Sequence, residues 1–326
     1  MRVRVRSLSL SIFLAIATCL VAVQTHAQPF PTKTVKIVVP AGPGDGADIM
    51  GRAVGQRLAV LWQQPVVIEN RAGAGGVLGT EVAVKANPDG YTLLMGNASA
   101  QAINQALYAK LPFDVVRDLR SVALLASAPS VLVVNASVPA NSVAELIALL
   151  RRNPGRYVFS SGGNGTSAHL NAELFSVMAG VKMLHVPYKG ANPAINDLIA
   201  GSAQVFVGNL PPLLAHIRSG KLRALGITTT TRSPVLPDVP PIADTLPGYE
   251  SASWLGLFVP AGTPEDRIEK VRADAMGLMA LPEIRASIEQ AGFQAITGPQ
   301  PDYPAMVKRD VAKWQRVVQE SGATVN

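Results

Sequence analysis

The segment Val35–Asp48 reads VKIVVPAGPGDGAD and decides the fold class of this chain. The apolar run Val35–Val39 predicts a buried strand, and a glycine-rich loop, Pro40–Asp48, follows it directly. A helical spacing of apolar residues then extends over about Ala47–Leu61. A strand, a glycine loop and a helix in this order are typical of an α/β protein with parallel strands covered by helices.

The same succession continues along the chain and predicts an α/β fold throughout. Further strands are predicted at Val66–Glu69, Tyr91–Met95, Ser130–Val134, Tyr157–Ser160, Val205–Val207 and Leu222–Ile227. Further helices are predicted at Ser167–Ala179 and Tyr303–Glu320, after the capping box Ser142–Glu145, and after Thr263. At this length we expect two lobes, each built on a mixed, mostly parallel sheet flanked by helices.

The N-terminus has the features of a secretory signal peptide. Arg2, Arg4 and Arg6 form a basic start, an apolar stretch covers Leu8–Val23, and Thr25-His26-Ala27 offers small residues before a cut. The apolar stretch is shorter than the roughly 20 residues of a membrane span. We therefore expect residues 1–27 to be removed and the mature protein to act in the periplasm.

Composition excludes several classes of chemistry for the mature chain. The single cysteine, Cys19, lies inside the predicted leader, which leaves no disulfide, thiolate nucleophile or cysteine metal site. None of His169, His185 and His216 is followed by a second histidine four residues on, so no metal site is expected. The chain has 29 basic and 22 acidic residues, but no basic run, which argues against nucleic-acid binding.

Three glycine loops share one geometry, because each connects a predicted strand to a predicted helix. They are Pro40–Asp48 (PAGPGDGAD), Asn70–Gly79 (NRAGAGGVLG) and Ser160–Thr166 (SSGGNGT). Glycine lets backbone N–H groups approach a ligand, and a helix N-terminus carries about half a positive charge. The loops therefore predict a site that holds a carboxylate without needing an arginine.

Two enzymatic interpretations compete with this binding site. Gly42–Ala47 fits the G-x-G-x-x-A dinucleotide pattern after a strand, and Glu69 ends the next strand. Pro43 removes a backbone donor from that turn, and an exported protein meets little soluble NAD. Ser160, Ser161 and His169 suggest a hydrolase only if their spacing is ignored, and no G-x-S-x-G or H-E-x-x-H motif is present. We therefore expect a binding protein without a cofactor.

The order of the motifs resembles the Bug family, the extracytoplasmic receptors related to tripartite tricarboxylate transporters. The resemblance covers the whole mature chain and is carried by Pro40–Asp48, Pro65–Gly76, Asn87–Leu94, His185–Gly190, Gly220–Leu225 and Pro260–Pro264. It implies a two-lobed periplasmic binding protein of the type II flytrap kind. By this similarity, one lobe is expected at residues 28–128 and 252–326, and the other at residues 129–251.

The resemblance also implies which residues hold a ligand, chiefly through main-chain groups of two facing loops. The implied ligand-binding residues are Ala41, Gly42, Gly44, Asp45, Asp48, Ser99, Gly162, Gly163, Asn164, Gly165, Thr166, His169, Tyr188, Gly190, Gly208 and Asn209. This chain departs from the usual family pattern at Ala41, Gly42, Asp45, Ala47 and Gly208. Asp45 could repel a second ligand carboxylate or accept an ammonium group, and the sequence leaves both open.

The expected function is therefore capture of a small organic carboxylate or an acidic amino acid between the lobes. Membrane permease subunits are the expected partners, and a sensor protein that reads the closed form is the alternative. The receptor is expected to act as a monomer and without metal or cofactor. An exported α/β enzyme is the third possibility.

Overall fold

The computed structural model describes residues 30–324, and the predicted leader lies outside them. Residues from Lys33 onward form one compact unit. Its strands are β1 (Val35–Val39), β2 (Val66–Asn70), β3 (Thr92–Asn97), β4 (Leu119–Asn135), β5 (Val158–Ser161), β6 (Leu184–Pro187), β7 (Val205–Asn209), β8 (Leu222–Ile227), β9 (Ala252–Pro260) and β10 (Gln294–Ala295). Its α-helices are α2 (Gly46–Trp62), α3 (Val77–Val84), α4 (Asn104–Leu107), α5 (Val143–Arg152), α6 (Ser167–Ala179), α7 (Ala191–Ala200), α8 (Leu214–Arg218), α9 (Glu265–Ala280), α10 (Pro282–Gln290) and α11 (Tyr303–Ser321). Short turns of other helix types are η1 (Ala74–Gly76), η2 (Ser99–Ile103), η3 (Pro211–Leu213) and η4 (Ile242–Asp244).

The strands form one mixed sheet in the order β2-β1-β3-β9-β4-β7-β5-β6, with β10 and β8 also paired to β4. Strand β1 is parallel to β2 and β3, and β5 is parallel to β6 and β7. The pairs β3–β9, β4–β7, β4–β8, β4–β9 and β4–β10 are antiparallel. The mixed sheet is confirmed, but parallel pairs do not dominate, because β4 and β9 run in opposite directions beside each other in the middle.

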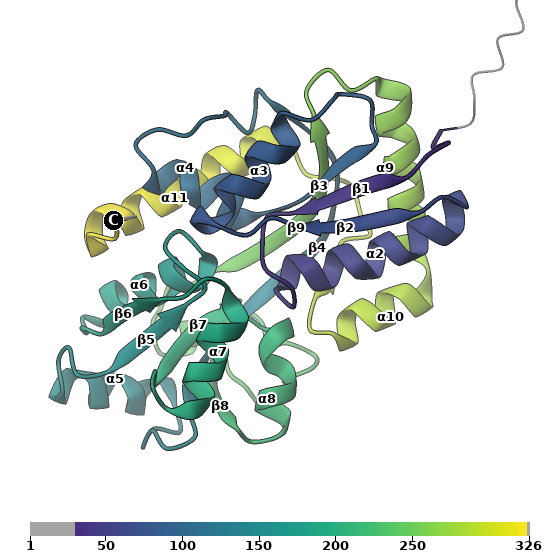
Figure 1. Cartoon of the computed structure of the whole chain (residues 1–326). Coiled ribbons are helices and arrows are strands. Elements are labelled where there is room, and N and C mark those ends of the chain that lie inside the picture. Colours follow the sequence, from purple (N-terminus) through teal and green to yellow (C-terminus); the bar gives the residue numbers. More distant parts are fainter. Residues whose placement is uncertain (1–29, 325–326) are drawn as a thin grey trace, which may run out of the picture. The chain divides into compact units, whose positions relative to one another are not determined.

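The long strand β4 takes part in two groups of strands, and this produces the two lobes. Its first part, Leu119–Pro129, pairs with β9, whereas Ser130–Asn135 pairs with β7 and β8. In Figure 1, β1, β2 and β3 lie with α2, α3 and α9 in the upper lobe, and β5 to β8 lie with α5 to α8 in the lower lobe. The predicted two-lobed α/β architecture is confirmed.

Alternating side chains of the strands pack against helices on both faces. In the lower lobe, Leu132 and Val134 join a cluster with α5 and α6, while Val131 and Val133 join a cluster with α7 and α8. In the upper lobe, a cluster around Val38 includes residues of α3 and α11. Helix α2 covers the other face, where a side chain at Gly55 would contact Ile37 and Ile68. Each part of the sheet is thus covered by helices on both faces.

Local sequence signals explain where several helices begin. The side chain of Asp45 accepts the N–H of Ala47 at the start of α2, and Ser142 accepts the N–H of Glu145 at the start of α5. Thr166 accepts the N–H of His169 at the start of α6. These residues are good N-caps because their short side chains replace a missing backbone acceptor. None of the helices within residues 30–324 combines the length and the hydropathy of a membrane span.

Candidate functional site

A cavity of about 630 Å³ lies where β1, β2, β3, β5, β6 and β7 end, between loops of the two lobes. The loop after β1 contributes Pro40–Gly42 and Asp45, and the loop after β2 contributes Ala72–Gly76. The loops after β5 and β6 contribute Gly162–Asn164 and Pro187–Ala191 from the other lobe. Ligands of open α/β sheets bind outside the carboxyl ends of the strands, and this cavity has that position.

Four helices begin at this cavity, and all four of their N-cap residues line it. The N-caps are Asp45 for α2, Gly76 for α3, Thr166 for α6 and Gly190 for α7. The N-terminal end of each helix carries unpaired N–H groups and a partial positive charge. The cavity therefore favours an anion through backbone groups. Among its lining residues, Asp45 is the only acidic side chain and Lys189 the only basic one.

The first glycine loop is held in shape by Asp48, whose carboxylate is almost fully buried. The carboxylate accepts the N–H of Gly44 at 2.8 Å, the Nε of Arg52 at 3.0 Å and the Nδ2 of Asn70 at 2.9 Å. Arg52 also forms an ion pair with it. Although burial opposes ionisation, these partners together lower the pKa of Asp48 below its usual value.

Asp45 lies on the same loop, but its carboxyl group has a different environment. Its Oδ1 accepts the N–H of Ala47 at 3.0 Å, and no ion pair of Asp45 is present among residues 30–324. Burial raises the pKa of Asp45; the Ala47 hydrogen bond works against this shift, and the nearby charge of Asp48 adds to it. The half-buried carboxyl group of Asp45 thus lines the cavity without a cationic partner.

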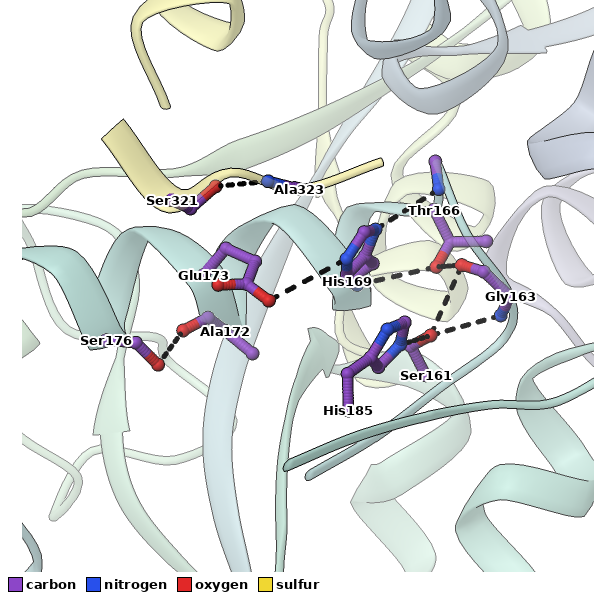
Figure 2. Close-up of polar contacts among 11 residues, drawn as sticks. Ser161, Gly163, Thr166, His169, Ala172, Glu173, Ser176, His185, Ser321 and Ala323 are labelled. Carbon is purple, nitrogen blue, oxygen red and sulfur yellow. Dashed lines mark hydrogen bonds and ion pairs between the residues drawn. The ribbon is translucent and has the colours of Figure 1, made fainter. Parts of the chain in front are cut away.

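The third glycine loop lies beside the stacked rings of His169 and His185 (Figure 2). The ring of His169 stacks on His185 at a centroid distance of 4.1 Å, and His185 stacks on Phe159 at 4.6 Å. The N–H of Gly165 donates to Nδ1 of His169, and Nε2 of His185 lies 2.7 Å from the hydroxyl of Ser161. The stack therefore supports the backbone of this loop from behind.

Both histidines of the stack are neutral at neutral pH. Burial lowers the pKa of His169 to about 4. Burial also lowers the pKa of His185 to about 3, and the neighbouring ring of His169 adds to this shift. The carboxylate of Glu173 lies 3.8 Å from Nε2 of His169, and burial raises the pKa of Glu173. These groups are therefore structural supports of the loop.

The structure brings most of the predicted site residues together around the cavity. Those that line it are Ala41, Gly42, Asp45, Ser99, Gly162, Gly163, Asn164, Thr166, Tyr188, Gly190 and Asn209. They come from both lobes, and Ser99 after β3 accepts the N–H of Ser167 on α6 at 2.9 Å. This bond joins the two sides of the cavity.

Five predicted residues do not line the cavity: Gly44, Asp48, Gly165, His169 and Gly208. Gly44 and Asp48 bond to each other within the first loop, and Gly165 donates to the ring of His169. His169 is 2% exposed and packs into the stack rather than into the cleft. Gly208 lies where a side chain would overlap the ring of Phe206. Each of the five lies behind the lining layer or beside it.

The second glycine loop lines the cavity, although no residue of it is among the predicted site residues. A side chain at Gly76 would come within 3.0 Å of the Pro40 carbonyl, so this loop can approach the first loop only as glycine. The fully buried Asn104 donates through Nδ2 to the Gly75 carbonyl and holds the loop in place. The sequence did contain a signal for this loop, because its glycines connect a predicted strand to a predicted helix. Tyr108 and Lys189, which also line the cavity, have no comparable signal.

Comparison with known proteins gives one consistent family. Residues 50–323 match the family described as tripartite tricarboxylate transporter family receptor. The protein BugT of Bordetella pertussis is 35% identical over 94% of this chain and 95% of its own length. The structure of Rpa4515 of R. palustris with adipate has a TM-score of 0.87 and 32% identity, covering 90% of this chain and 99% of that one. MatC of Rhodopseudomonas palustris with bound malate has a TM-score of 0.83 and 29% identity, and the match covers 89% of this chain and 100% of MatC. Within residues 30–324, no group of three or more acidic, histidine or cysteine side chains could hold a metal ion.

Proposed function

We propose a function from one premise: the chain belongs to the tripartite tricarboxylate transporter receptor family. Members of this family are solute-binding receptors and not enzymes. The protein is accordingly a receptor that captures a small carboxylate in the cavity between its two lobes. Its structural relatives with adipate and malate support this class of ligand.

The observation that carries the proposal is the convergence of four helix N-termini on one cavity. At the starts of α3, α6 and α7, where the N-cap is not acidic, free N–H groups can hold a carboxylate, and no arginine lines the cavity. Since both lobes supply these groups, a bound carboxylate would contact both lobes at once. A ligand that bridges two lobes binds the closed form more tightly than the open one and shifts the equilibrium toward closure.

The proposal also covers where the protein acts, its oligomeric state, the bounds of its lobes and its partners. The protein reaches the periplasm through the leader of residues 1–27 and acts there as a monomer. One lobe comprises residues 28–128 and 252–326, and the other comprises residues 129–251. This division agrees with the change of pairing partners of β4 between Pro129 and Ser130. The closed form would present a surface that membrane permease subunits recognise.

A thermal-shift screen of the protein purified from the periplasmic fraction tests the proposal. The panel contains mono-, di- and tricarboxylates and amino acids, with the amide or methyl ester of each acid as its control. A ligand at a hundred times its Kd stabilises the native state by about 2.7 kcal/mol. We expect a free acid to raise the melting temperature and its neutral derivative to leave the melting temperature unchanged. Stabilisation by the neutral derivatives alone would contradict the proposed anion site.

A further inference from the structure

The carboxylate of Asp45 is the feature of the cavity that anion binding does not explain. A cavity that collects a ligand carboxylate through helix N-termini gains nothing from an acidic wall. The other carboxylate of the same loop, that of Asp48, is neutralised by Arg52 and by hydrogen bonds from Gly44 and Asn70. The carboxylate of Asp45 receives one hydrogen bond, from the N–H of Ala47, and that bond occupies only Oδ1.

The side chain of Asp45 also changes what the start of α2 can bind. Because Asp45 is the N-cap, its own carboxylate already occupies the positive end of that helix. A ligand carboxylate is left with the starts of α3, α6 and α7, whose N-caps are Gly76, Thr166 and Gly190. None of these three N-caps is acidic. The cavity is therefore polarised, with anion-binding helix ends around part of its wall and one carboxylate at the start of α2.

The second oxygen of Asp45, Oδ2, has no hydrogen-bond donor within the described chain. It is not among the fully buried polar atoms that lack a partner, and Asp45 itself lines the cavity. Lys189 forms no ion pair with it, and the ammonium-bearing side chain is exposed. When the lobes close over a ligand, water leaves the cavity, and a carboxylate without a partner becomes costly. A cationic group on the ligand removes that cost.

We propose that Asp45 is a specificity-determining residue that selects a carboxylate carrying an amino group at its other end. The ligand carboxylate contacts the starts of α3, α6 and α7, and the ligand ammonium contacts the carboxylate of Asp45. A ligand with a carboxylate at both ends places its second negative charge near Asp45 and is disfavoured. This inference rests on the proposed function and narrows its ligand class from carboxylates in general to ω-amino carboxylates.

Matched pairs of ligands test this inference by isothermal titration calorimetry. The pairs are succinate and 3-aminopropanoate, glutarate and 4-aminobutanoate, and adipate and 5-aminopentanoate, so that only one terminal group changes within a pair. The variant is Asp45→Asn, because asparagine still caps a helix but carries no charge. The control is Asp302→Asn, which removes the same charge from the N-cap of α11, outside the lining of the cavity.

We expect the unmodified protein to bind the amino member of at least one pair more tightly than the diacid. Asp45→Asn should weaken that amino ligand about ten- to hundredfold, as expected for a lost hydrogen bond to a charged group, and should strengthen the diacid. Asp302→Asn should leave both affinities unchanged.

The outcomes separate this inference from the proposed function. Binding of diacids at least as tightly as their amino partners in every pair would overturn the role of Asp45 and leave a carboxylate receptor. An amine preference that Asp45→Asn does not change would overturn it equally. Failure of every carboxylate, amino or not, to bind either protein would overturn the proposed function and this inference together.

Discussion

Gly163 is the residue of the third glycine loop whose replacement tests the cavity most directly. Its φ angle is +122°, and a side chain there would come within 3.0 Å of the Tyr188 carbonyl. Gly163→Ala should therefore displace the loop that lines the cavity and weaken ligand binding at least about tenfold. The strained backbone should also lower the free energy of unfolding by about 1 to 3 kcal/mol. Calorimetric Kd values and denaturant unfolding measure the two effects separately.

Gly155 offers a control for the backbone strain alone. It also has a positive φ angle, +71°, but no atom lies within 4 Å of an added Cβ, and it does not line the cavity. Gly155→Ala should lower the free energy of unfolding, by about 1 kcal/mol, without changing the Kd. If both variants bind the ligand as tightly as the unmodified protein, Gly163 is not part of the binding site.

Residue types alone predicted much of the cavity wall but not the direction of each side chain. Glycines in strand–loop–helix connections correctly indicated where backbone would be accessible. His169 shows the limit, because its place in the first turn of α6 allows it to face the cleft or the core. The choice depends on His185, which lies on the strand β6 and offers a ring to stack on. No local pattern contains that contact.

At the scale of elements, most predicted strands and helices are confirmed, and two of the missed strand segments have a common cause. The helix Ser167–Ala179 and the strand Leu222–Ile227 have the predicted bounds. The first part of β4 and the whole of β9 were not predicted. Pro129 interrupts the apolar run of β4, so the sequence pattern does not show that the strand already begins at Leu119. Both β4 and β9 are buried on two faces, so their sequences do not alternate between apolar and polar residues. Their pairing with each other stabilises them, and sequence periodicity does not report it.

The stack between α6 and β6 makes a prediction about acid stability. The unfolded chain binds a proton at His185 as the pH falls through about 6.5, whereas the folded protein resists protonation until about pH 3. Since the unfolded state then binds more protons, stability decreases as the pH falls between these values. His185 alone should account for about 2 to 3 kcal/mol of stability lost between pH 7 and pH 4.

His185→Gln checks this prediction by urea unfolding at a series of pH values. Glutamine can still bond to Ser161 but does not titrate, so the variant should lose less stability on acidification than the unmodified protein. Its stability at pH 7 should be lower, because the ring contact with His169 is lost. If the stability of His185→Gln depended on pH as steeply as that of the unmodified protein, His185 would not be the source of the acid sensitivity.

At the scale of the whole receptor, two contacts between the lobes lie outside the lining of the cavity. Leu170 of α6 packs with Trp314 and Val317 of α11, which forms an apolar contact between the two lobes. At the first glycine loop, the amide of Asn192 on α7 donates to the Pro43 carbonyl at 2.9 Å. Asn192 itself is exposed and does not line the cavity. We therefore expect Asn192 to influence a ligand through the equilibrium between open and closed lobes.

Asn192→Ala is expected to weaken ligand binding without removing any ligand contact. One hydrogen bond contributes about 0.5 to 1.5 kcal/mol, and losing it in the closed form raises the observed Kd by about two- to twelvefold. Small-angle X-ray scattering of the ligand-free variant should show a radius of gyration at least as large as that of the unmodified protein, and saturating ligand should restore the closed value. Asn153→Ala, which removes a bond to the Leu149 carbonyl within one lobe, should leave the Kd unchanged.

Because the cost of closing is shared by every ligand, Asn192→Ala should weaken all bound carboxylates by the same factor, whereas a change in the cavity wall such as Asp45→Asn should alter their order. A ligand-dependent effect of Asn192→Ala would show that this residue contacts the ligand, and closure would then not explain its role.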